Sequence, residues 1–376
     1  MNIVRVDHHN RKQIRDFLGL PARIYRGVPQ WVPPLAMDER RRLDTRRYPY
    51  YRHSEAAFFL AYHGQIPVGR LAILDNRLHN EHNHEKTAFF YLFESENDPG
   101  IAEGLFSEAF SWTAARGLNR VFGPRGFTAL DGYGLLVKGF ERRPAFGLPY
   151  NPPYYPAFIE SLGFRPEEDI SSGYLSSGMK FPERISQLAS TIQARRGLEI
   201  IRFSTRKELR RALKYLKELY NGVLATSNGG IPITDEEIRE LSNQLLWFAD
   251  PALIKIIMKD RHPVGFLLAY PDISKAFQES GGRLFPFGWL KLLLEVKRTD
   301  WININGAGLL PEYQGLGGTA ILYHELFSSV NHNKQYKHAE IVQIGTGNLR
   351  MQREMENFGI DFYKAHRTYS RYLNID

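Results

Sequence analysis

The sequence predicts an α/β (α+β) protein made of two halves of similar fold, each a mixed, mostly antiparallel sheet flanked by helices. Three features recur at one spacing: a first strand, a hairpin that returns on Pro-Val-Gly, and a helix that closes into a strand around a glycine. They begin or centre at Asn2 and Leu198, Pro67 and Pro263, and Gly163 and Gly359 (198 − 2 = 263 − 67 = 359 − 163 = 196). One offset at three separate places indicates two repeats. We place them at residues 1–180 and 198–376.

Hydrophobic periodicity gives the order of elements in the first half. The expected elements are a strand at 2–6, a helix carrying Ile14, Phe17 and Leu18, a hairpin at 56–74, a strand at 87–93 and a helix from Asp98 to Gly117. Asp98 and Pro99 are typical of a helix start, and Gly117 of a helix end.

The second half repeats this order and adds an insertion. The expected elements are a strand at 198–203, a helix opened by a capping box of Thr205 and Glu208, a hairpin at 253–270, a strand at 301–310, a helix from Thr319, a strand at 339–344, a helix from Asn348 and a hairpin at 361–373. The insertion, 272–299, holds an apolar run at 284–294. We expect this run to be buried against the other half; a lid over an acyl chain and a membrane-surface helix are the alternatives.

Composition bounds the class of protein. The 376 residues are 43% hydrophobic and carry a net charge of +8, which favours anionic partners. The chain has no cysteine, so disulfides and thiol nucleophiles are excluded. No apolar run approaches the roughly 18 to 20 residues that span a bilayer. We therefore expect a soluble, cytoplasmic protein without a transmembrane segment, and its short basic runs resemble no nucleic-acid module.

A glycine-rich loop follows the strand at 301–310. It begins at Gln314, contains three glycines in four positions, and leads into a helix whose apolar residues recur at helical spacing. Glycines bring backbone N–H groups close to a ligand, and a helix N-terminus favours an anion. The loop therefore suits a pyrophosphate, although a tight turn explains the same glycines. It lacks the Gly-Lys-Ser/Thr of NTPases and the dinucleotide fingerprint.

This loop resembles the acyl-CoA pyrophosphate loop of the GNAT N-acyltransferases, and the element order of both halves resembles the GNAT fold. The family pattern is Gln or Arg, two residues, Gly, one residue, then Gly or Ala. Gln314 and Gly317 match it, whereas Thr319 departs from it. The resemblance implies an acetyl-CoA or other acyl-CoA cofactor and no metal. The implied cofactor-binding residues are Leu309, Leu310, Gln314, Gly315, Leu316, Gly317, Gly318, Thr319 and Asn348.

The resemblance also implies direct attack of an amine on the thioester, with no covalent enzyme intermediate. Many members carry a glutamate base and a tyrosine acid at positions that here are Asn303 and Met355, neither of which can transfer a proton at neutral pH. Tyr313 and Tyr363 are candidate replacements, as is a water relay through Glu312 or His366. Activity is therefore an expectation with its acid and base unassigned.

The first half differs from the second at the equivalent loop. Its strand at 87–93 leads into an acidic stretch, 94–100, which would repel a pyrophosphate. We therefore expect a degenerate half that keeps the fold without the cofactor site. Loops between 123 and 155 are rich in glycine and aromatic residues and are candidates for a substrate pocket. The candidate substrate-binding residues are Arg125, Asp131, Tyr133 and Tyr154.

The function predicted from the sequence is acyl transfer from acyl-CoA to a small-molecule or peptide amine. The alternatives are aminoacyl-tRNA-dependent transfer of the peptidoglycan type, long-chain acyl transfer, and a catalytically inactive CoA sensor or scaffold. The run His79, His82 and His84 matches no standard metal spacing, and a polar loop after a strand explains it. The acceptor, the acyl length and the oligomeric state do not follow from the sequence.

Overall fold

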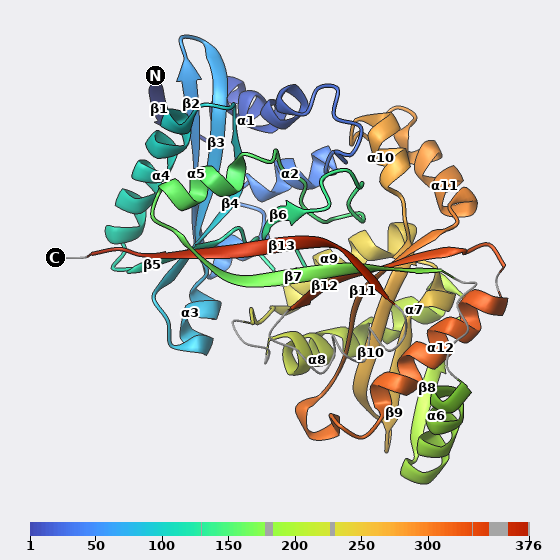
Figure 1. Ribbon diagram of the computed structural model, residues 1–376. Coiled ribbons are helices and arrows are strands. Elements are labelled where there is room, and N and C mark those ends of the chain that lie inside the picture. Colours follow the sequence, from blue (N-terminus) through green and yellow to red (C-terminus); the bar gives the residue numbers. More distant parts are fainter. Residues whose placement is uncertain (129, 177–182, 226–229, 333, 346–359, 375–376) are drawn as a thin grey trace. The chain divides into compact units, whose positions relative to one another are not determined.

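The computed structural model describes residues 1–128, 130–176, 183–225, 230–332, 334–345 and 360–374 (Figure 1). The chain packs into two compact units. Unit 1 comprises 1–170, 277–289 and 364–376, and unit 2 comprises 171–276 and 290–363. Strands β7 and β13 and helices α10 and α11 each have residues in both units. The domain boundaries predicted from the sequence stay a prediction.

Unit 1 is a sheet covered by helices. Its sheet has the order β1-β2-β3-β4-β5-β13, with β6 also paired to β13, and α4 packs on β2 and β3 around a core rich in phenylalanine. The elements are β1 (Asn2–Arg5), α1 (Arg11–Ile24), α2 (Ala36–Arg42), η1 (Pro49–Arg52), β2 (Glu55–His63), β3 (Ile66–Asp75), α3 (Arg77–Asn83), β4 (Thr87–Ser95), α4 (Pro99–Ala114), β5 (Arg120–Gly123), β6 (Leu135–Lys138), α5 (Tyr155–Ser161) and the start of β7 (Arg165–Ser176).

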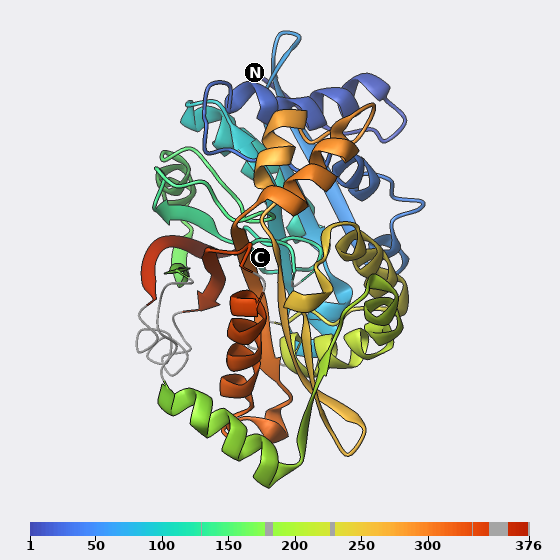
Figure 2. The same ribbon diagram turned by 90° about the vertical axis from the view of Figure 1, so that its right-hand side faces the viewer.

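Unit 2 has the sheet order β7-β12-β11-β10-β9-β8, and α12 packs on β9, β10 and β11. Helix α6 lies beside α12, as Figure 2 shows in green and orange-red. The elements are α6 (Glu183–Arg196), β8 (Leu198–Arg202), α7 (Arg206–Ala212), η2 (Leu213–Tyr215), α8 (Leu216–Leu219), η3 (Tyr220–Leu224), α9 (Asp235–Phe248), η4 (Pro251–Leu253), β9 (Lys255–Lys259), β10 (His262–Pro271), α10 (Ser274–Ser280), α11 (Gly288–Arg298), β11 (Trp301–Leu309), η5 (Pro311–Tyr313), α12 (Gly318–His332), β12 (His338–Gly345) and β13 (Asp361–Tyr372).

The strand register confirms the internal repeat. Gly69 pairs with Ser95 in unit 1, and Gly265 pairs with Leu309 in unit 2. The numbers differ by 196 on the hairpin strand (265 − 69) and by 214 on the next strand (309 − 95), because unit 2 carries the insertion between them. Both strand pairs contain one register shift at nearly the same place, between Arg70 and Ala72 and, displaced by one residue, between Leu267 and Ala269. The two halves therefore share strand geometry as well as order.

Three local predictions are wrong. The expected hairpin at 361–373 is the single strand β13, because Arg367 and Thr368 supply no turn residue. The histidine run is not a loop, because His79 and His82 lie in helix α3, which Asn76 caps, and His84 is the C-cap residue of that helix. The apolar run at 284–294 is not buried, since Phe285, Phe287 and four residues of α11 are more than 40% exposed. No helix in the described residues is long and apolar enough to cross a membrane.

Candidate functional site

The loop between β11 and α12 joins a strand to a helix, in the order that the sequence indicated. Gln314 and Gly315 are exposed, and α12 begins at Gly318. Among the described residues, no protein group accepts a hydrogen bond from the backbone N–H of Gly315, Leu316 or Gly317. The first N–H groups of α12 also lack partners within the helix. These donors at a helix N-terminus suit an anion.

Packing also explains two of these glycines. Gly317 has φ +83°, and a Cβ built on it would lie 2.2 Å from Cδ1 of Ile192 on α6. A Cβ on Gly318 would lie 2.9 Å from Cδ2 of Leu309. Helix α6 therefore covers one side of the loop at Gly317. The residues that stay exposed are Gln314, whose Nε2 donates to the Leu309 carbonyl at 3.2 Å, and Gly315.

The main chain of β11 continues beyond its pairing with β12. Within the described part of the chain, the parallel pairing covers 301–304 with 338–341, whereas the strands end at Leu309 and Gly345. Residues 305–308 are only partly buried. On the other side, a Cβ on Gly308 would meet Val223 of η3 at 2.2 Å. The last residues of β11 thus have main-chain groups on the β12 side that this ladder does not use.

A row of polar side chains crosses the sheet of unit 2 where that pairing ends. Tyr270 on β10 pairs with Asn303 on β11, which in turn pairs with Glu340 on β12, so the three side chains lie on one face. All three are buried, with exposed fractions of 4%, 1% and 3%. The Nδ2 of Asn303 has no hydrogen-bond partner among the described residues. Buried unsatisfied donors are costly, and such groups frequently mark functional sites.

Two further side chains bond to this row. Tyr363 donates its hydroxyl to Oε2 of Glu340 at 2.8 Å, and Asn305 donates from Nδ2 to the Tyr270 hydroxyl at 2.9 Å. Burial raises the pKa of Tyr270 above its ordinary value, although the bond from Asn305 acts in the opposite direction. Tyr270 is therefore a neutral donor at physiological pH. Glu340 and Tyr363 form a carboxyl–phenol pair that can exchange a proton.

The matching row in unit 1 is apolar. The offsets of 196 and 214 lead from Tyr270 and Asn303 to Leu74 on β3 and Phe89 on β4, and Phe89 pairs with Phe122 on β5 as Asn303 pairs with Glu340 (270 − 74 = 196 and 303 − 89 = 214). Leu74 and Phe89 are at most 1% exposed, and the rings of Phe89 and Phe122 meet edge to face at 6.0 Å. A fold of this kind is therefore stable with hydrocarbon at these positions. The polar row of unit 2 is not a requirement of the sheet.

In unit 1, tyrosine side chains form hydrogen bonds with the residues at the end of β4. The hydroxyls of Tyr25 and Tyr155 both donate to Oε2 of Glu94 at 2.8 Å, and Ser95 donates its N–H to the Tyr155 hydroxyl at 2.7 Å. Burial raises the pKa of Glu94 to about 7, against the opposing effects of Arg70 and the tyrosine hydrogen bonds. These contacts occupy main-chain groups at the end of β4, the strand equivalent to β11.

The predicted substrate-binding residues of the first half are engaged within unit 1. Arg125 lies over the Tyr133 ring, 5.8 Å from its centre, and so these two come together. Asp131 forms an ion pair with Arg42 at 2.5 Å and accepts from the Thr128 N–H. Tyr154 precedes α5 and donates to the Ser95 carbonyl at 2.9 Å. Their role in substrate binding stays a prediction.

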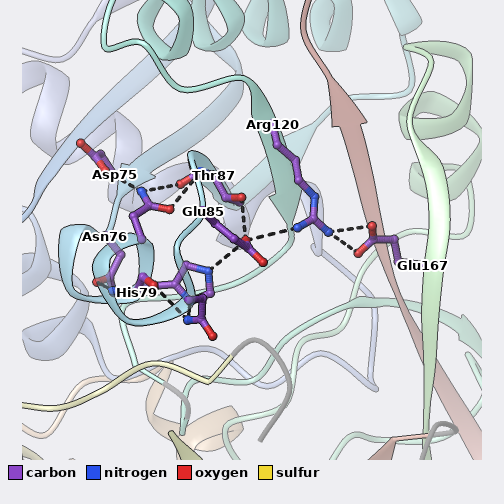
Figure 3. Close-up of polar contacts among 9 residues, drawn as sticks. Asp75, Asn76, His79, Glu85, Thr87, Arg120 and Glu167 are labelled. Atoms are coloured by element: carbon purple, nitrogen blue, oxygen red, sulfur yellow. Dashed lines mark hydrogen bonds and ion pairs between the residues drawn. The ribbon is translucent and has the colours of Figure 1, made fainter. Parts of the chain in front are cut away.

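The histidine run takes part in a hydrogen-bond network in unit 1 (Figure 3). His79 is 2% exposed, and its ring nitrogens lie 3.4 Å from Glu85 Oε2 and 3.0 Å from Asn83 Nδ2. The same Glu85 oxygen accepts from Thr87 at 2.8 Å and from Arg120 at 3.3 Å. Groups of three or more metal-ligand side chains are absent from the described residues. The network explains the burial of His79.

The candidates for acid and base fall in different places. Tyr313 lies in η5 against the core of unit 2, with Lys259 Nζ 5.7 Å from its ring centre, and Glu312 is exposed. His366 lies in unit 1, fully buried, and donates from Nε2 to the Pro149 carbonyl at 3.0 Å. Asn348 and Met355 lie outside the described residues. Of these candidates, Tyr363 is the one whose hydroxyl bonds to the carboxyl group of Glu340.

Sequence reasoning missed the carboxylate on β12. Glu340 lies within the run Ala339–Ile344, which reads as an ordinary strand. The available signal was one ionisable residue in an apolar strand. Its significance needs the register, which places it opposite Asn303 and not opposite a solvent-facing residue. The capping box of Thr234 with Glu237 was also missed, while Thr205 caps α7 as predicted.

Comparison with solved structures identifies the class of fold. A tandem GNAT protein from the clavulanic acid biosynthesis pathway matches with a TM-score of 0.56 and 11% identity, over 99% of this chain and 98% of that one. A GCN5-related glucosamine N-acetyltransferase region of a fungal multi-domain enzyme matches with a TM-score of 0.54 and 11% identity, over 98% of this chain and 38% of that one. The chain has the tandem GNAT fold.

Two curated proteins are similar over nearly the whole chain. "Protein YghO" of Escherichia coli strain K12 is 26% identical over 97% of this chain and 94% of its own length. "Bacterial ceramide synthase" of Caulobacter vibrioides is 27% identical over 96% of this chain and 95% of its own length. No family model matches the sequence.

Proposed function

We propose that this protein is an acyl-CoA-dependent N-acyltransferase whose unit 2 binds the acyl-CoA and carries the chemistry. The observation that carries the proposal is the buried row of Tyr270, Asn303 and Glu340 beside the end of β11, in a fold where the same row is otherwise hydrocarbon. The exposed loop at Gln314 and Gly315 supplies donors for the pyrophosphate. The similarity to a bacterial ceramide synthase supports a long-chain acyl group and a long-chain amino alcohol as substrates.

The reaction forms a C–N bond and breaks the C–S bond of the thioester. Glu340 accepts the proton that the amine loses, and Tyr363 gives a proton to the leaving thiolate. The hydrogen bond of 2.8 Å between Tyr363 and Glu340 then returns the proton and restores both groups. Asn303 supplies an amide donor that has no partner among the described residues, and main-chain N–H groups of β11 beyond its described pairing with β12 polarise the thioester carbonyl. This assignment replaces the base and acid that Asn303 and Met355 cannot provide.

Release of CoA measures the reaction directly. Because the chain has no cysteine, a thiol reagent reports only the CoA released. We expect release from a long-chain acyl-CoA with a long-chain amino alcohol, with an amide product seen by mass spectrometry, and slower release with acetyl-CoA. The Glu340→Gln variant should lose this activity while still binding CoA.

Two outcomes would contradict the proposal. CoA binding without release for any pair of acyl-CoA and amine would favour a sensor or scaffold. Transfer only from aminoacyl-tRNA would favour the peptidoglycan-type reaction.

A cytoplasmic location, which the sequence predicts, agrees with the location of acyl-CoA but is a separate proposal.

A further inference from the structure

The insertion of the second half presents an apolar surface to solvent. Phe285 and Phe287 precede α11 and are 73% and 70% exposed. On α11 itself, four apolar side chains are 41% to 44% exposed, namely Trp289, Leu290, Leu293 and Leu294. We call these six residues the α11 surface. Groups of exposed apolar side chains often mark interaction sites, whereas single exposed apolar residues are common on any protein surface.

Helix α11 has one face against the protein and an apolar face exposed to solvent. Leu292 is 4% exposed and faces the protein, whereas Leu290, Leu293 and Leu294 share the opposite face at helical spacing. The segment is also held in place. Trp289 donates from Nε1 to the Pro286 carbonyl at 3.0 Å, and Gln335 donates to the Val296 carbonyl at 3.0 Å. The α11 surface is therefore presented by ordered structure.

The charges around the α11 surface have one sign. Segment 283–298 carries four basic residues and one acidic residue. The basic residues Arg283, Lys291, Lys297 and Arg298 are all exposed, whereas Glu295 is partly buried. A leucine face with phenylalanine and tryptophan at one end, bordered by lysine and arginine, has the composition of helices that lie in the interface of an anionic bilayer.

We propose that α11 and the loop before it dock this protein on an anionic lipid bilayer, with the α11 surface entering the headgroup region. The helix has 11 residues, far fewer than the roughly 20 that span a bilayer, so it lies on the membrane surface. The basic residues complement acidic headgroups, a feature that a purely apolar protein partner would not need. This inference does not depend on the proposed reaction.

Co-sedimentation of the full chain with vesicles tests the proposal. We expect binding to vesicles of phosphatidylcholine with phosphatidylglycerol, and much weaker binding to phosphatidylcholine alone. The variant Leu290→Gln/Leu293→Gln keeps charge and helix propensity, and should weaken binding by about tenfold or more because two apolar side chains that would enter the headgroup region are lost. Lys297→Gln/Arg298→Gln should weaken binding to anionic vesicles and reduce its salt dependence.

Ile66→Gln is the matched control, because Ile66 is an exposed apolar side chain (57%) at the hairpin between β2 and β3. It should bind vesicles like the parent. Equal binding by Leu290→Gln/Leu293→Gln and the parent would overturn the proposal, as would no binding to either vesicle. A lipid-free dimer, seen by light scattering and lost in the leucine variant, would overturn it in favour of contact between two copies. Circular dichroism and thermal melting of each variant report on its fold and keep this result separate from the proposed function.

Discussion

The two halves of this chain have the same strand order and register, but apolar side chains in unit 1 stand where unit 2 has polar ones. Where unit 1 crosses its sheet with Leu74, Phe89 and Phe122, unit 2 crosses its own with a tyrosine, an asparagine and a glutamate. The end of β4 is occupied by tyrosines and an acid, whereas the end of β11 leads to exposed glycine and glutamine. Because the fold tolerates hydrocarbon at these positions, the polar set in unit 2 is best explained by function.

The largest expected effect separates Glu340 of unit 2 from Glu94 of unit 1. Glu340→Gln keeps the shape of the side chain and its bond with Tyr363 but removes the proton acceptor. We expect kcat/KM to fall by about 100-fold or more, as for loss of a general base, with CoA affinity unchanged. Glu94→Gln in unit 1 is the matched control and should stay within about twofold of the parent. Equal losses in both variants would break the comparison.

The second prediction concerns the pH dependence of folding stability. The pKa of Glu94 is raised from 4.5 to about 7 by burial, so the folded state favours the protonated form. Its contribution to stability is fully present below pH 4.5 and is lost as the pH rises towards and through 7. The amide side chain of the Glu94→Gln variant cannot ionise. Chemical denaturation should therefore show that the free energy of unfolding of this variant, relative to that of the parent, is about 2 kcal/mol higher at pH 8 than at pH 5. A difference independent of pH would show that Glu94 is ionised in the folded protein.

The smallest effect is expected when a polar residue in the row of unit 2 is replaced by an apolar one, as found at the equivalent position of unit 1. Asn303→Leu removes a buried amide whose Nδ2 has no partner among the described residues. We expect the free energy of unfolding to rise by about 1 kcal/mol while activity falls about tenfold, a trade of stability against function. Thermal melting and the CoA-release assay measure the two changes. Loss of stability in this variant would mean that Asn303 is structural.

The sequence predicted the repeat, most strands and the helix after the glycine loop, because these depend on local periodicity. It did not predict the role of Glu340, since a residue gains that role only from its neighbour across the β11–β12 pair. The C-terminal hairpin was predicted wrongly, since Arg367 and Thr368 supply no turn residue and the chain continues in β13. The exposure of α11 was missed because an apolar run looks the same whether protein or lipid covers it.

Calorimetric titration with CoA tests the central claim, that unit 2 alone holds the cofactor. Thr319 lies in the first turn of α12, where an added acid favours the helix but repels a pyrophosphate. Ser328→Glu places the same charge on an exposed position of that helix. We expect one CoA per chain, a Kd at least about tenfold weaker for Thr319→Glu, and an unchanged Kd for Ser328→Glu. Two CoA per chain, or undiminished binding by Thr319→Glu, would contradict the account.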